Sequence, residues 1–285
     1  MEQGRSGTIR YSIFDPTGNI TALVGDPVPV PQQPSVAAEI MRLHPAVEQV
    51  GFVRFPRPSE TGALPELRMA GGEFCGNASM CAAALYAATL WQAGEREPEL
   101  VSLRVSGTDK PVEVNLSRED AARWSAGVMF PPALSVGSME LEWNGLRASL
   151  PLIRMESITH LAIETGSPFF PLKDDREAAG QAVKTWCGAC RAPGLGLMFL
   201  AAADGAFHLT PLVYIPGSDT LFWENSCASG SAAVGMLLAE RSGRAVDLTL
   251  TEPGGTLRVA CDPLSGETRL FGRTVFLEQH ILQSR

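Results

Sequence analysis

Short stretches of alternating apolar and polar residues run through most of this chain and predict a protein rich in β-strands. The segment Thr8–Phe14 alternates, the turn Asp15–Asn19 follows it, and Ile20–Val24 resumes the pattern, so a hairpin is predicted here. Apolar or alternating runs predict further strands at Val47–Val53, Leu100–Val105, Pro111–Leu116, Ala126–Phe130, Met139–Trp143, Leu146–Leu150, Met155–Glu164, Leu195–Ala203, Ala206–Val213, Asp247–Thr251, Leu257–Cys261 and Leu270–Leu277. The 28 glycines and 21 prolines provide the turns that so many short strands require.

Four segments have the pattern of α-helices, and two of them are rich in alanine. Ser35–Leu43 and Asp175–Trp186 each have one apolar face, which is typical of a helix that packs on a sheet. The helix predicted at Cys81–Gln92 and the one that ends at Arg241 are apolar all round. This pattern predicts that both alanine-rich helices are buried.

A loop that contains a carboxylate and a cysteine precedes each alanine-rich helix. The first loop is Glu73–Ser79 (EFCGNAS) and the second is Glu224–Ser231 (ENSCASGS). A cysteine at a helix N-terminus lies among unpaired N–H groups at the positive end of the helix dipole, which lowers the pKa of its thiol and makes it a reactive base or nucleophile. The same N–H groups can bind a carboxylate. Because one loop lies in each half of the chain, we expect one site between two pseudo-symmetric halves.

Length and charge narrow the class of protein. A chain of 285 residues, 45% of them hydrophobic, is long enough for two domains. A formal net charge of −8 argues against a nucleic-acid partner, because phosphate binding needs a basic face. No segment approaches the about 20 apolar residues of a membrane-spanning helix, and residues 1–14 lack the pattern of a secretory signal. We therefore expect a cytoplasmic protein whose six cysteines are reduced.

Three polar residues next to apolar strands have both a structural and a functional interpretation. Asn19 is either a turn residue with an unusual φ angle or a side-chain amide that faces a ligand. Glu48 is either solvated at the edge of a strand or part of a site. His160, one of four histidines, is either a satisfied structural residue or a site residue. The sequence leaves these alternatives open.

Cys187 and Cys190 form a C-x-x-C pair, a pattern of zinc-binding and redox proteins. A structural zinc site needs four ligands and usually two such pairs. The sequence has no second pair, and His208 and Cys261 lie at no recognisable ligand spacing. Two incidental thiols at a helix end are the simpler interpretation, and a zinc or redox thiol module is the alternative from a different class.

The motifs around Cys75 and Cys227 resemble those of the diaminopimelate epimerase-like family. Residues 75–81 (CGNASMC) resemble the C-G-N-G-x-R-C loop of that family, and residues 227–232 (CASGSA) resemble its second cysteine loop. Three shorter segments also match the family. Gly18–Asn19 resembles its G-N hairpin, Pro253–Leu257 its P-G-G-x-L motif and Leu270–Gly272 its closing L-x-G strand. The motifs occur in matching order over nearly the whole chain.

This resemblance implies an α/β (α+β) fold of two pseudo-symmetric halves, each a mixed β-sheet wrapped around a central helix. The first half would comprise residues 1–131 and the second residues 132–271, with the C-terminal strand at 272–285 returning to the first half. The active site of such proteins lies in the cleft between the halves. The family includes amino-acid racemases and epimerases that use no cofactor.

Departures from the family's motifs bear on the substrate. The arginine with which diaminopimelate epimerases hold the distal carboxylate of their substrate is absent from the equivalent stretch Pro216–Asp219 (PGSD). Ile158 stands where the family's G-N-P-H element has its asparagine, and Arg68–Gly71 lacks the asparagine that precedes the first cysteine. The strings Met69–Asn77 (MAGGEFCGN) and Ile158–His160 (ITH) are more similar to the histidine racemases that supply D-histidine for opine-type metallophore synthesis.

The resemblance implies racemisation at the α-carbon by two groups on opposite faces of the substrate, without pyridoxal phosphate, any other cofactor or a metal. Cys75 and Cys227 would serve as one thiolate base and one thiol acid. The reaction that the narrower match favours converts L-histidine to D-histidine. The backbone amides that would hold the α-carboxylate belong to Gly76, Asn77, Ala228 and Ser229. The side chains that would hold the remaining polar groups of the substrate are those of Asn19, Glu48, Asn77, His160 and Glu224.

Alternatives to this reading differ in substrate or in class. One is a diaminopimelate epimerase, or a racemase of another amino acid. A second is a hydrolase with Cys227 as nucleophile and His160 as base, and a third is the zinc or redox module at Cys187 and Cys190. The expected partner is a small amino-acid substrate, with neither nucleic acid nor membrane, and the oligomeric state is left open with a homodimer among the expectations.

Overall fold

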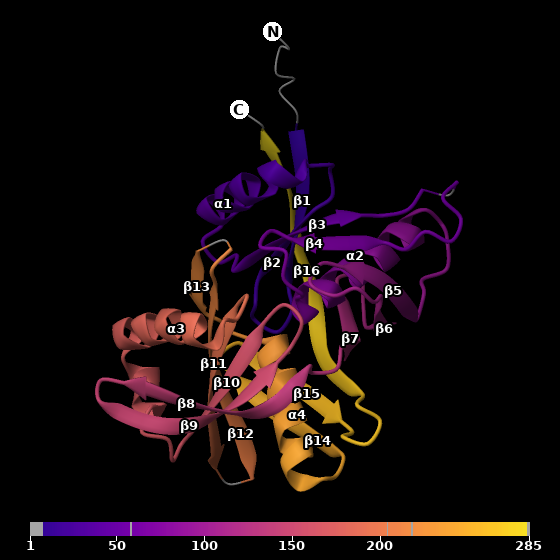
Figure 1. Ribbon diagram of the computed structural model, residues 1–285. Helices are drawn as coiled ribbons and strands as arrows, with labels where there is room; N and C mark the ends of the chain where they lie inside the picture. Colours follow the sequence, from indigo (N-terminus) through magenta and orange to yellow (C-terminus); the bar gives the residue numbers. More distant parts are fainter. Residues whose placement is uncertain (1–7, 58, 204, 218, 284–285) are drawn as a thin grey trace.

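The computed structural model describes residues 8–57, 59–203, 205–217 and 219–283, which form two stacked halves (Figure 1). The strands are β1 (Thr8–Asp15), β2 (Thr21–Val24), β3 (Gln49–Arg54), β4 (Glu66–Met69), β5 (Leu100–Val105), β6 (Val112–Arg118), β7 (Arg123–Phe130), β8 (Ser135–Trp143), β9 (Leu146–Arg154), β10 (Thr159–Glu164), β11 (Leu195–Ala203), β12 (Ala206–Ile215), β13 (Thr220–Trp223), β14 (Val246–Glu252), β15 (Gly255–Cys261) and β16 (Thr268–Gln283). The α-helices are α1 (Gln33–Leu43), α2 (Gly76–Gln92), α3 (Arg176–Cys190) and α4 (Ala228–Ser242). Within the described residues, no helix is long and apolar enough to cross a lipid bilayer.

In the first half, the strands close into a barrel around α2. Hydrogen-bonded neighbours follow the order β1-β2-β3-β4-β5-β6-β7-β16, and β16 pairs back with β1. Residues Gly76–Ala84 of α2 are all buried. Most side chains of these turns are small, so strands can surround the helix on every face. The prediction that a helix apolar all round is buried is confirmed here.

The second half wraps a similar series of strands around α4. Its strands follow the order β16-β15-β14-β12-β11-β10-β9-β8, and β13 pairs with β12. Every residue of α4 from Ala228 to Leu237 is buried. The alanine-rich run again allows strands to pack against all sides of the helix.

The helices also lie between corresponding parallel strands in the two halves. An outer helix connects each of two parallel strand pairs: α1 lies between β2 and β3, and α3 lies between β10 and β11. A central helix connects each of the other two parallel pairs, α2 between β4 and β5 and α4 between β12 and β14. The other neighbours are antiparallel, so the sheet is mixed. The predicted fold of two pseudo-symmetric halves, each wrapped around a central helix, is confirmed.

β16 belongs to both halves, and Figure 1 shows it running along their junction toward the N-terminus. Its residues Thr268–Phe271 pair with β15 and Thr268–Val275 pair with β7. Val275–Gln283 then pair with β1. The predicted boundary at residue 131 lies between β7 and β8. The predicted ranges, and the segment searched for a secretory signal, include residues 1–7 and 284–285, which lie outside the described residues.

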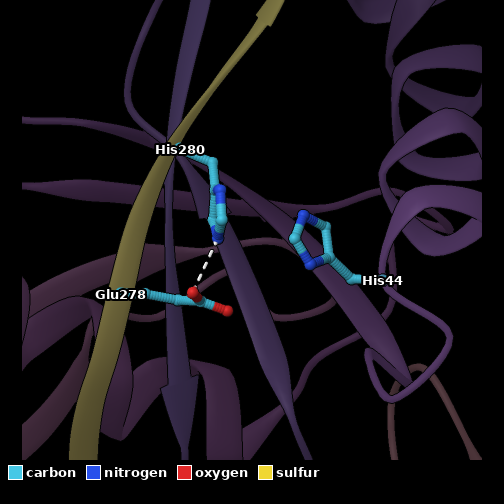
Figure 2. Close-up of side chains that lie close together, drawn as sticks. All are labelled: His44, Glu278 and His280. Atoms are coloured by element: carbon cyan, nitrogen blue, oxygen red, sulfur yellow. Dashed lines mark ion pairs between the residues drawn. The ribbon is translucent and has the colours of Figure 1, made fainter.

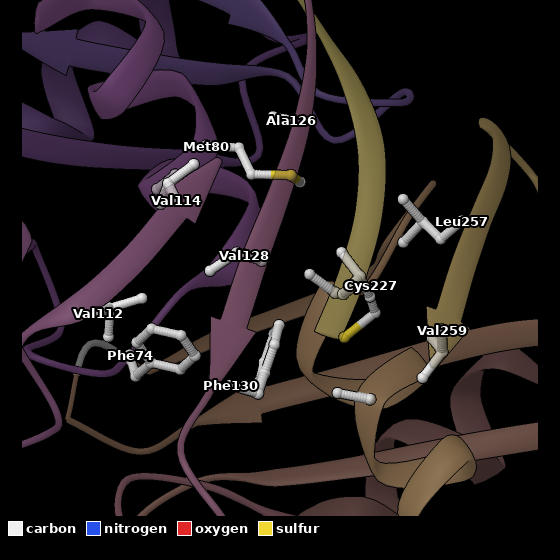
Figure 3. Packing of buried hydrophobic residues seen from close by; sticks show 14 of the residues in the cluster. Phe74, Met80, Val112, Val114, Ala126, Val128, Phe130, Cys227, Leu257 and Val259 are labelled. Atoms are coloured by element: carbon white, nitrogen blue, oxygen red, sulfur yellow. The ribbon is translucent and has the colours of Figure 1, made fainter. Parts of the chain in front are cut away.

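One hydrophobic core extends across both halves. Figure 3 shows part of it, with Phe74 and Phe130 from the first half near Cys227 and Val259 from the second. The rings of Phe74 and Phe130 pack edge to face with their centroids 5.1 Å apart. Two smaller clusters lie under the outer helices, one beneath α1 and one beneath α3. Because the largest core is shared, the two halves stabilise each other.

Several element boundaries differ from the sequence predictions, and three of these differences have a clear local cause. α2 begins at Gly76 instead of Cys81, because the backbone of Cys75 is extended and its side chain caps the helix. α3 begins after Asp175, whose carboxylate accepts the amide of Ala178 at 3.0 Å, and it continues to Cys190. β10 begins at Thr159 instead of Met155. Hydrophobic periodicity alone does not reveal where a cap or a bend ends an element.

Candidate active site

The N-termini of α2 and α4 meet end to end between the two halves. Cys75 is the N-cap of α2 and Cys227 is the N-cap of α4. A Cβ atom added to Gly76 would lie 3.0 Å from Cβ of Ala228, so the first turns approach as closely as a glycine permits. The Asn77 side chain donates to the carbonyl of Ser226 at 3.1 Å and joins the two helix starts. The two cysteine loops therefore meet at one place in the fold.

A cavity of about 50 Å³ lies between the helix starts. Its walls are formed by Asn19, Gln49, Glu73, Phe74, Cys75, Gly76, Asn77, Ile158, Val213, Ile215, Glu224, Cys227, Ala228 and Ser229. Among the residues predicted from the sequence to form the site, only Glu48 and His160 are absent from these walls. The cavity is much smaller than the roughly 300–1,000 Å³ of ordinary ligand pockets. In this arrangement the two halves are closed on each other.

Cys75 is held by one side chain and one amide. Its thiol donates to Oε1 of Gln49 at 3.0 Å, and its sulfur accepts the amide of Ala78 at 3.4 Å. Gln49 is fixed in turn because its Nε2 donates to Oγ1 of Thr21 at 2.7 Å. The thiol of Cys75 is thus oriented by residues of the parallel strands β2 and β3 of its own half.

Cys227 is held by a different set of contacts. Its sulfur accepts the amide of Gly230 at 3.4 Å and lies 3.6 Å from Oγ of Ser229. Its backbone N–H donates to Oε2 of Glu252 at 2.7 Å, and the other oxygen of this carboxylate accepts the hydroxyl of Ser231. Glu252 therefore fixes both ends of the first turn of α4.

Burial raises the pKa of both thiols, which corrects the prediction made from the helix N-termini. Enclosure raises the pKa of Cys75 to about 12, and the charges of Glu224 and Glu73 act in the same direction. Burial, followed by the carboxylates of Glu224 and Glu252, raises the pKa of Cys227 well above its ordinary value. The amide hydrogen bonds at the helix N-termini lower both values but are outweighed, because loss of water penalises a buried thiolate more strongly.

Four carboxylates surround the cysteine pair, and among the described residues no Lys, Arg or His side chain lines the cavity. Burial raises the pKa of Glu224 to about 8 and that of Glu252 to about 8. Burial also raises the pKa values of Glu73 and Glu48. Glu48 lies behind the wall, where it accepts the side chains of Asn19 at 2.9 Å and Asn225 at 2.5 Å. The site has the electrostatic character of a pocket for a cationic group.

Several buried acceptor atoms at the cavity have no hydrogen-bond partner in the described part of the chain. They are Oδ1 of Asn19, Oδ1 of Asn77 and Oε2 of Glu73, and all three residues line the cavity. Unpaired buried polar atoms are uncommon in proteins and are usually explained by a bound water, ion or ligand. Three acceptors without donors fit a ligand that carries N–H groups.

His160 is buried behind the cavity wall and does not line it. Its Nε2 lies 3.1 Å from Oγ of Ser229, and burial lowers its pKa to about 3, so the imidazole is neutral. Ser229 stands between His160 and Cys227. A hydrolase in which His160 takes the proton of Cys227 directly does not fit this geometry.

The zinc alternative at Cys187 and Cys190 finds no support in the geometry. Cys187 and Cys190 lie in the last turn of α3 and pack in the core beneath it. Their thiols contact the carbonyl of Ala192 at 3.4 Å and Sδ of Met139 at 3.5 Å. Among the described residues, no further histidine, cysteine or carboxylate joins them in a metal-binding group. Both thiols are therefore part of the packing beneath α3.

Sequence reasoning missed Gln49, Glu73 and Glu252 as site residues. Glu73 opens the first cysteine loop as Glu224 opens the second, so the internal repeat contained the signal for it. Glu252 directly precedes the Pro253–Leu257 motif, whose resemblance to the family lies in its proline and glycines, so the carboxylate was not predicted as a site residue. Gln49 comes from a strand distant in sequence and gave no local signal.

The helix-centred halves and the enclosed cavity at their junction define an isomerase of the amino-acid racemase and epimerase class. Within this class, the chain belongs to the histidine racemase family: the family model described as "Histidine racemase CntK N-terminal domain" matches residues 8–270. The resemblance to histidine racemases that the motifs indicated is therefore confirmed.

Curated relatives and solved structures agree with this assignment. A histidine racemase of Staphylococcus aureus (strain Mu50 / ATCC 700699) is 28% identical over 273 residues, which cover 93% of this chain and 94% of that protein. A histidine racemase of Fusobacterium nucleatum is 27% identical over 242 residues, covering 82% and 83% of the two chains. The crystal structure of a probable proline racemase from Agrobacterium radiobacter K84 superposes with a TM-score of 0.68 at 15% identity and covers 97% of this chain and 93% of that one. At this sequence identity, the similarity to the proline racemase structure shows a shared fold only.

Proposed function

We propose that this protein interconverts L- and D-histidine without a cofactor, with Cys75 and Cys227 as the two proton-transfer groups. The observation that carries the proposal is the pair of cysteine N-caps at one cavity whose charged side chains are all carboxylates. An amino-acid racemase needs an acid and a base on opposite faces of an α-carbon. Two helix N-termini that meet end to end provide such a pair.

The helix starts would bind the α-carboxylate of the substrate. The first amides of a helix have no preceding helical carbonyl to bond, and they lie at the positive end of the helix dipole. In α2 these amides belong to Gly76 and Asn77, and in α4 to Ala228 and Ser229. Amides from both helices at one carboxylate would also stabilise the negative charge that develops when the α-proton leaves.

The carboxylates would bind the cationic and N–H-bearing groups of the substrate. Glu73 and Glu224 line the cavity, and Oε2 of Glu73 and Oδ1 of Asn19 are acceptors without donors. An α-ammonium and an imidazole ring supply N–H donors for these atoms. A substrate with a second carboxylate would need a cationic partner at its far end, and the cavity wall contains none. Histidine therefore fits better than diaminopimelate.

The proton transfer follows from the two thiols. One cysteine, as thiolate, removes the α-proton and becomes a thiol, and the other, as thiol, delivers its proton to the opposite face and becomes a thiolate. The roles are exchanged after each turnover, so the protein is ready for the opposite enantiomer. The cationic ammonium of a bound substrate lowers the thiol pKa values that burial raises in the closed protein.

Substrate entry would require the halves to separate. The closed cavity of about 50 Å³ cannot admit an amino acid, and its walls come from both halves. Closure around the substrate excludes water, which strengthens the contacts between the carboxylates and the ammonium. The same closure protects the α-carbanion from protons of the solvent.

The test is proton exchange at the α-carbon in D₂O, followed by NMR and by chiral chromatography. The protein, with a thiol reductant and no added cofactor, is incubated with L-histidine, D-histidine, LL-diaminopimelate and other L-amino acids. Deuterium in the α-position of histidine together with the opposite enantiomer supports the proposal. Inversion of diaminopimelate alone would contradict the inference that the cavity favours histidine. Exchange with no amino acid would overturn the racemase assignment.

A further inference from the structure

A cluster of metal-binding side chains lies outside the catalytic cavity, where the C-terminal strand passes α1. It consists of His44, Glu278 and His280 (Figure 2). None of the three lines the cavity between the cysteines. The racemase chemistry makes no use of them, so their proximity needs its own explanation.

The fold brings the three residues together from two elements. Glu278 and His280 are two positions apart on β16, so their side chains lie on the same face of the strand. His44 directly follows α1, where its backbone N–H donates to the carbonyl of Ile40 at 2.8 Å. Figure 2 shows the imidazole of His44 extending from the end of that helix toward His280.

The donor atoms are close enough to share one ion. A ring nitrogen of each histidine and a carboxylate oxygen of Glu278 all lie within 4.8 Å of one another. Nε2 of His280 lies 3.1 Å from Oε2 of Glu278, and the two imidazole centroids are 4.4 Å apart. In a tetrahedral site with bonds of about 2.0–2.1 Å, ligand atoms are about 3.3 Å apart. Small side-chain rotations therefore suffice to bring the three donors to one ion.

Tyr11 orients the cluster from the neighbouring strand. It is 3% exposed and stands opposite His280 in the pairing of β1 with β16. Its hydroxyl lies 2.9 Å from Nε2 of His44, and its ring stacks on His280 with the centroids 5.4 Å apart. Histidines that bind metals commonly use their second nitrogen for such a hydrogen bond, which fixes the orientation of the ring.

The cluster is open to solvent on one side. The side chains of His280 and Glu278 are 31% and 54% exposed. An ion can therefore approach from the side of Glu278, while Nε2 of His280 is itself buried and has no hydrogen-bond partner among the described residues. Two imidazoles with one carboxylate suit zinc and the neighbouring transition metals, whereas calcium and magnesium prefer oxygen ligands alone.

We propose that His44, Glu278 and His280 form a binding site for a divalent transition-metal ion, with zinc as the representative ion. A bound ion would join the end of α1 to the C-terminal end of β16. Because it binds the folded chain, it would stabilise the fold by an amount that grows with the logarithm of its free concentration above Kd. The site is separate from the proton-transfer chemistry and does not depend on the proposed function.

The test is a Zn²⁺ titration by isothermal calorimetry on metal-free protein. The parent for these measurements carries Cys75→Ser and Cys227→Ser, so that the thiols of the cavity cannot take the ion. We expect one Zn²⁺ per chain, a melting temperature that rises with Zn²⁺, and no binding of Ca²⁺. His44→Ala and His280→Ala should each weaken binding more than tenfold, and Tyr11→Phe should weaken it about tenfold.

His208→Ala provides the matched control. His208 is exposed on β12 and belongs to no metal-binding group among the described residues, so its loss should leave Zn²⁺ affinity unchanged. Glu278→Gln keeps the shape of the ligand without its charge and serves if an alanine variant does not fold. Undiminished affinity in a His44→Ala/His280→Ala protein, or no Zn²⁺ binding by the parent, would overturn the assignment.

Discussion

Oε2 of Glu252 accepts the backbone N–H of Cys227 at 2.7 Å. This carboxylate is the last residue of β14, and its other oxygen accepts the hydroxyl of Ser231 in the first turn of α4. The proposed catalytic cysteine is therefore positioned by a strand that follows it in the sequence. Glu252 does not line the cavity, so it acts through Cys227 and is a positioning residue.

Glu252→Gln should lower the pKa of the Cys227 thiol, because the Glu252 charge is one of the causes that raise it. The amide can still accept the N–H of Cys227, so we expect a stable protein with kcat reduced about tenfold and little change in KM. Alkylation of Cys227, followed by peptide mass spectrometry across a pH series, measures the thiol pKa. Glu113→Gln, on the exposed face of β6, is the control. An unchanged alkylation profile would refute this electrostatic role.

Cys75→Ser and Cys227→Ser should each reduce racemisation in both directions by at least about 100-fold. A hydroxyl is a much weaker acid than a thiol, so one of the two proton transfers is lost in each variant. The remaining cysteine can still exchange the α-proton of one enantiomer without inverting it. Exchange and inversion are therefore measured separately for L- and D-histidine in D₂O.

Cys81→Ser is the matched control for these variants. Cys81 is also buried in α2, and its sulfur lies 3.2 Å from Oγ1 of Thr274, a contact that serine can keep. Activity near that of the wild type is expected. If Cys81→Ser were as inactive as Cys75→Ser, loss of packing would explain both results and the two-thiol scheme would lose its support.

The stability of the ligand-free protein should fall as the pH rises from about 6.5 to 8. Glu224 and Glu252 have pKa values raised to about 8 by burial, so in this range the folded protein retains protons that the unfolded chain has lost. His160 opposes the trend only near the lower end of this range, because its pKa of about 3 leaves it neutral when folded, whereas its ordinary value of 6.5 leaves it half protonated at pH 6.5 in the unfolded chain. Urea denaturation at the two pH values should show a smaller loss in Glu224→Gln. An identical pH dependence in this variant would contradict the raised pKa of Glu224.

Gly76→Ala should hold the two helix starts apart. The added methyl carbon would lie 2.5 Å from the ring of Phe130 and 3.0 Å from Cβ of Ala228. We expect a loss of stability of about 1–3 kcal/mol and a loss of activity, because closure of the halves is prevented. Gly188→Ala in α3, where the methyl group would meet no atom within 4 Å, should instead stabilise the protein by up to about 1 kcal/mol. Thermal melting and racemase assays of both variants provide the comparison.

The parts of the site that are local in sequence could be predicted, and the parts that depend on distant strands could not. The loops at Cys75 and Cys227 carry their carboxylate, cysteine and small residues within a few positions, so the pattern indicated helix N-termini. The thiol pKa values were predicted in the wrong direction because local pattern shows the helix dipole but not the burial around it. Gln49 and Glu252 reach the cysteines only through the pairing of the sheet.

The fold class was predictable only through the resemblance of the motifs around Cys75 and Cys227 to the diaminopimelate epimerase-like family. The hydrophobic pattern by itself indicated that the two alanine-rich helices are buried, but not how the strands are ordered around them. The return of residues 272–285 to the first half was expected only from the family resemblance, because nothing in Leu270–Leu277 itself indicates which strands it will pair with. The continuous core around Phe74 and Cys227 follows from the sharing of β16 between both halves.

Among the described residues, β16 is the last strand, and it pairs with β1. The barrel whose first strands are synthesised earliest is therefore completed last. During synthesis on the ribosome, β1 through β7 emerge long before the strand that closes them. Until then β1 and β7 each present an unpaired edge, which is a template for association with other chains. Long-range pairing of this kind slows folding. Residues Thr268–Gln283 should therefore govern how quickly newly made chains escape aggregation, although they line no part of the cavity.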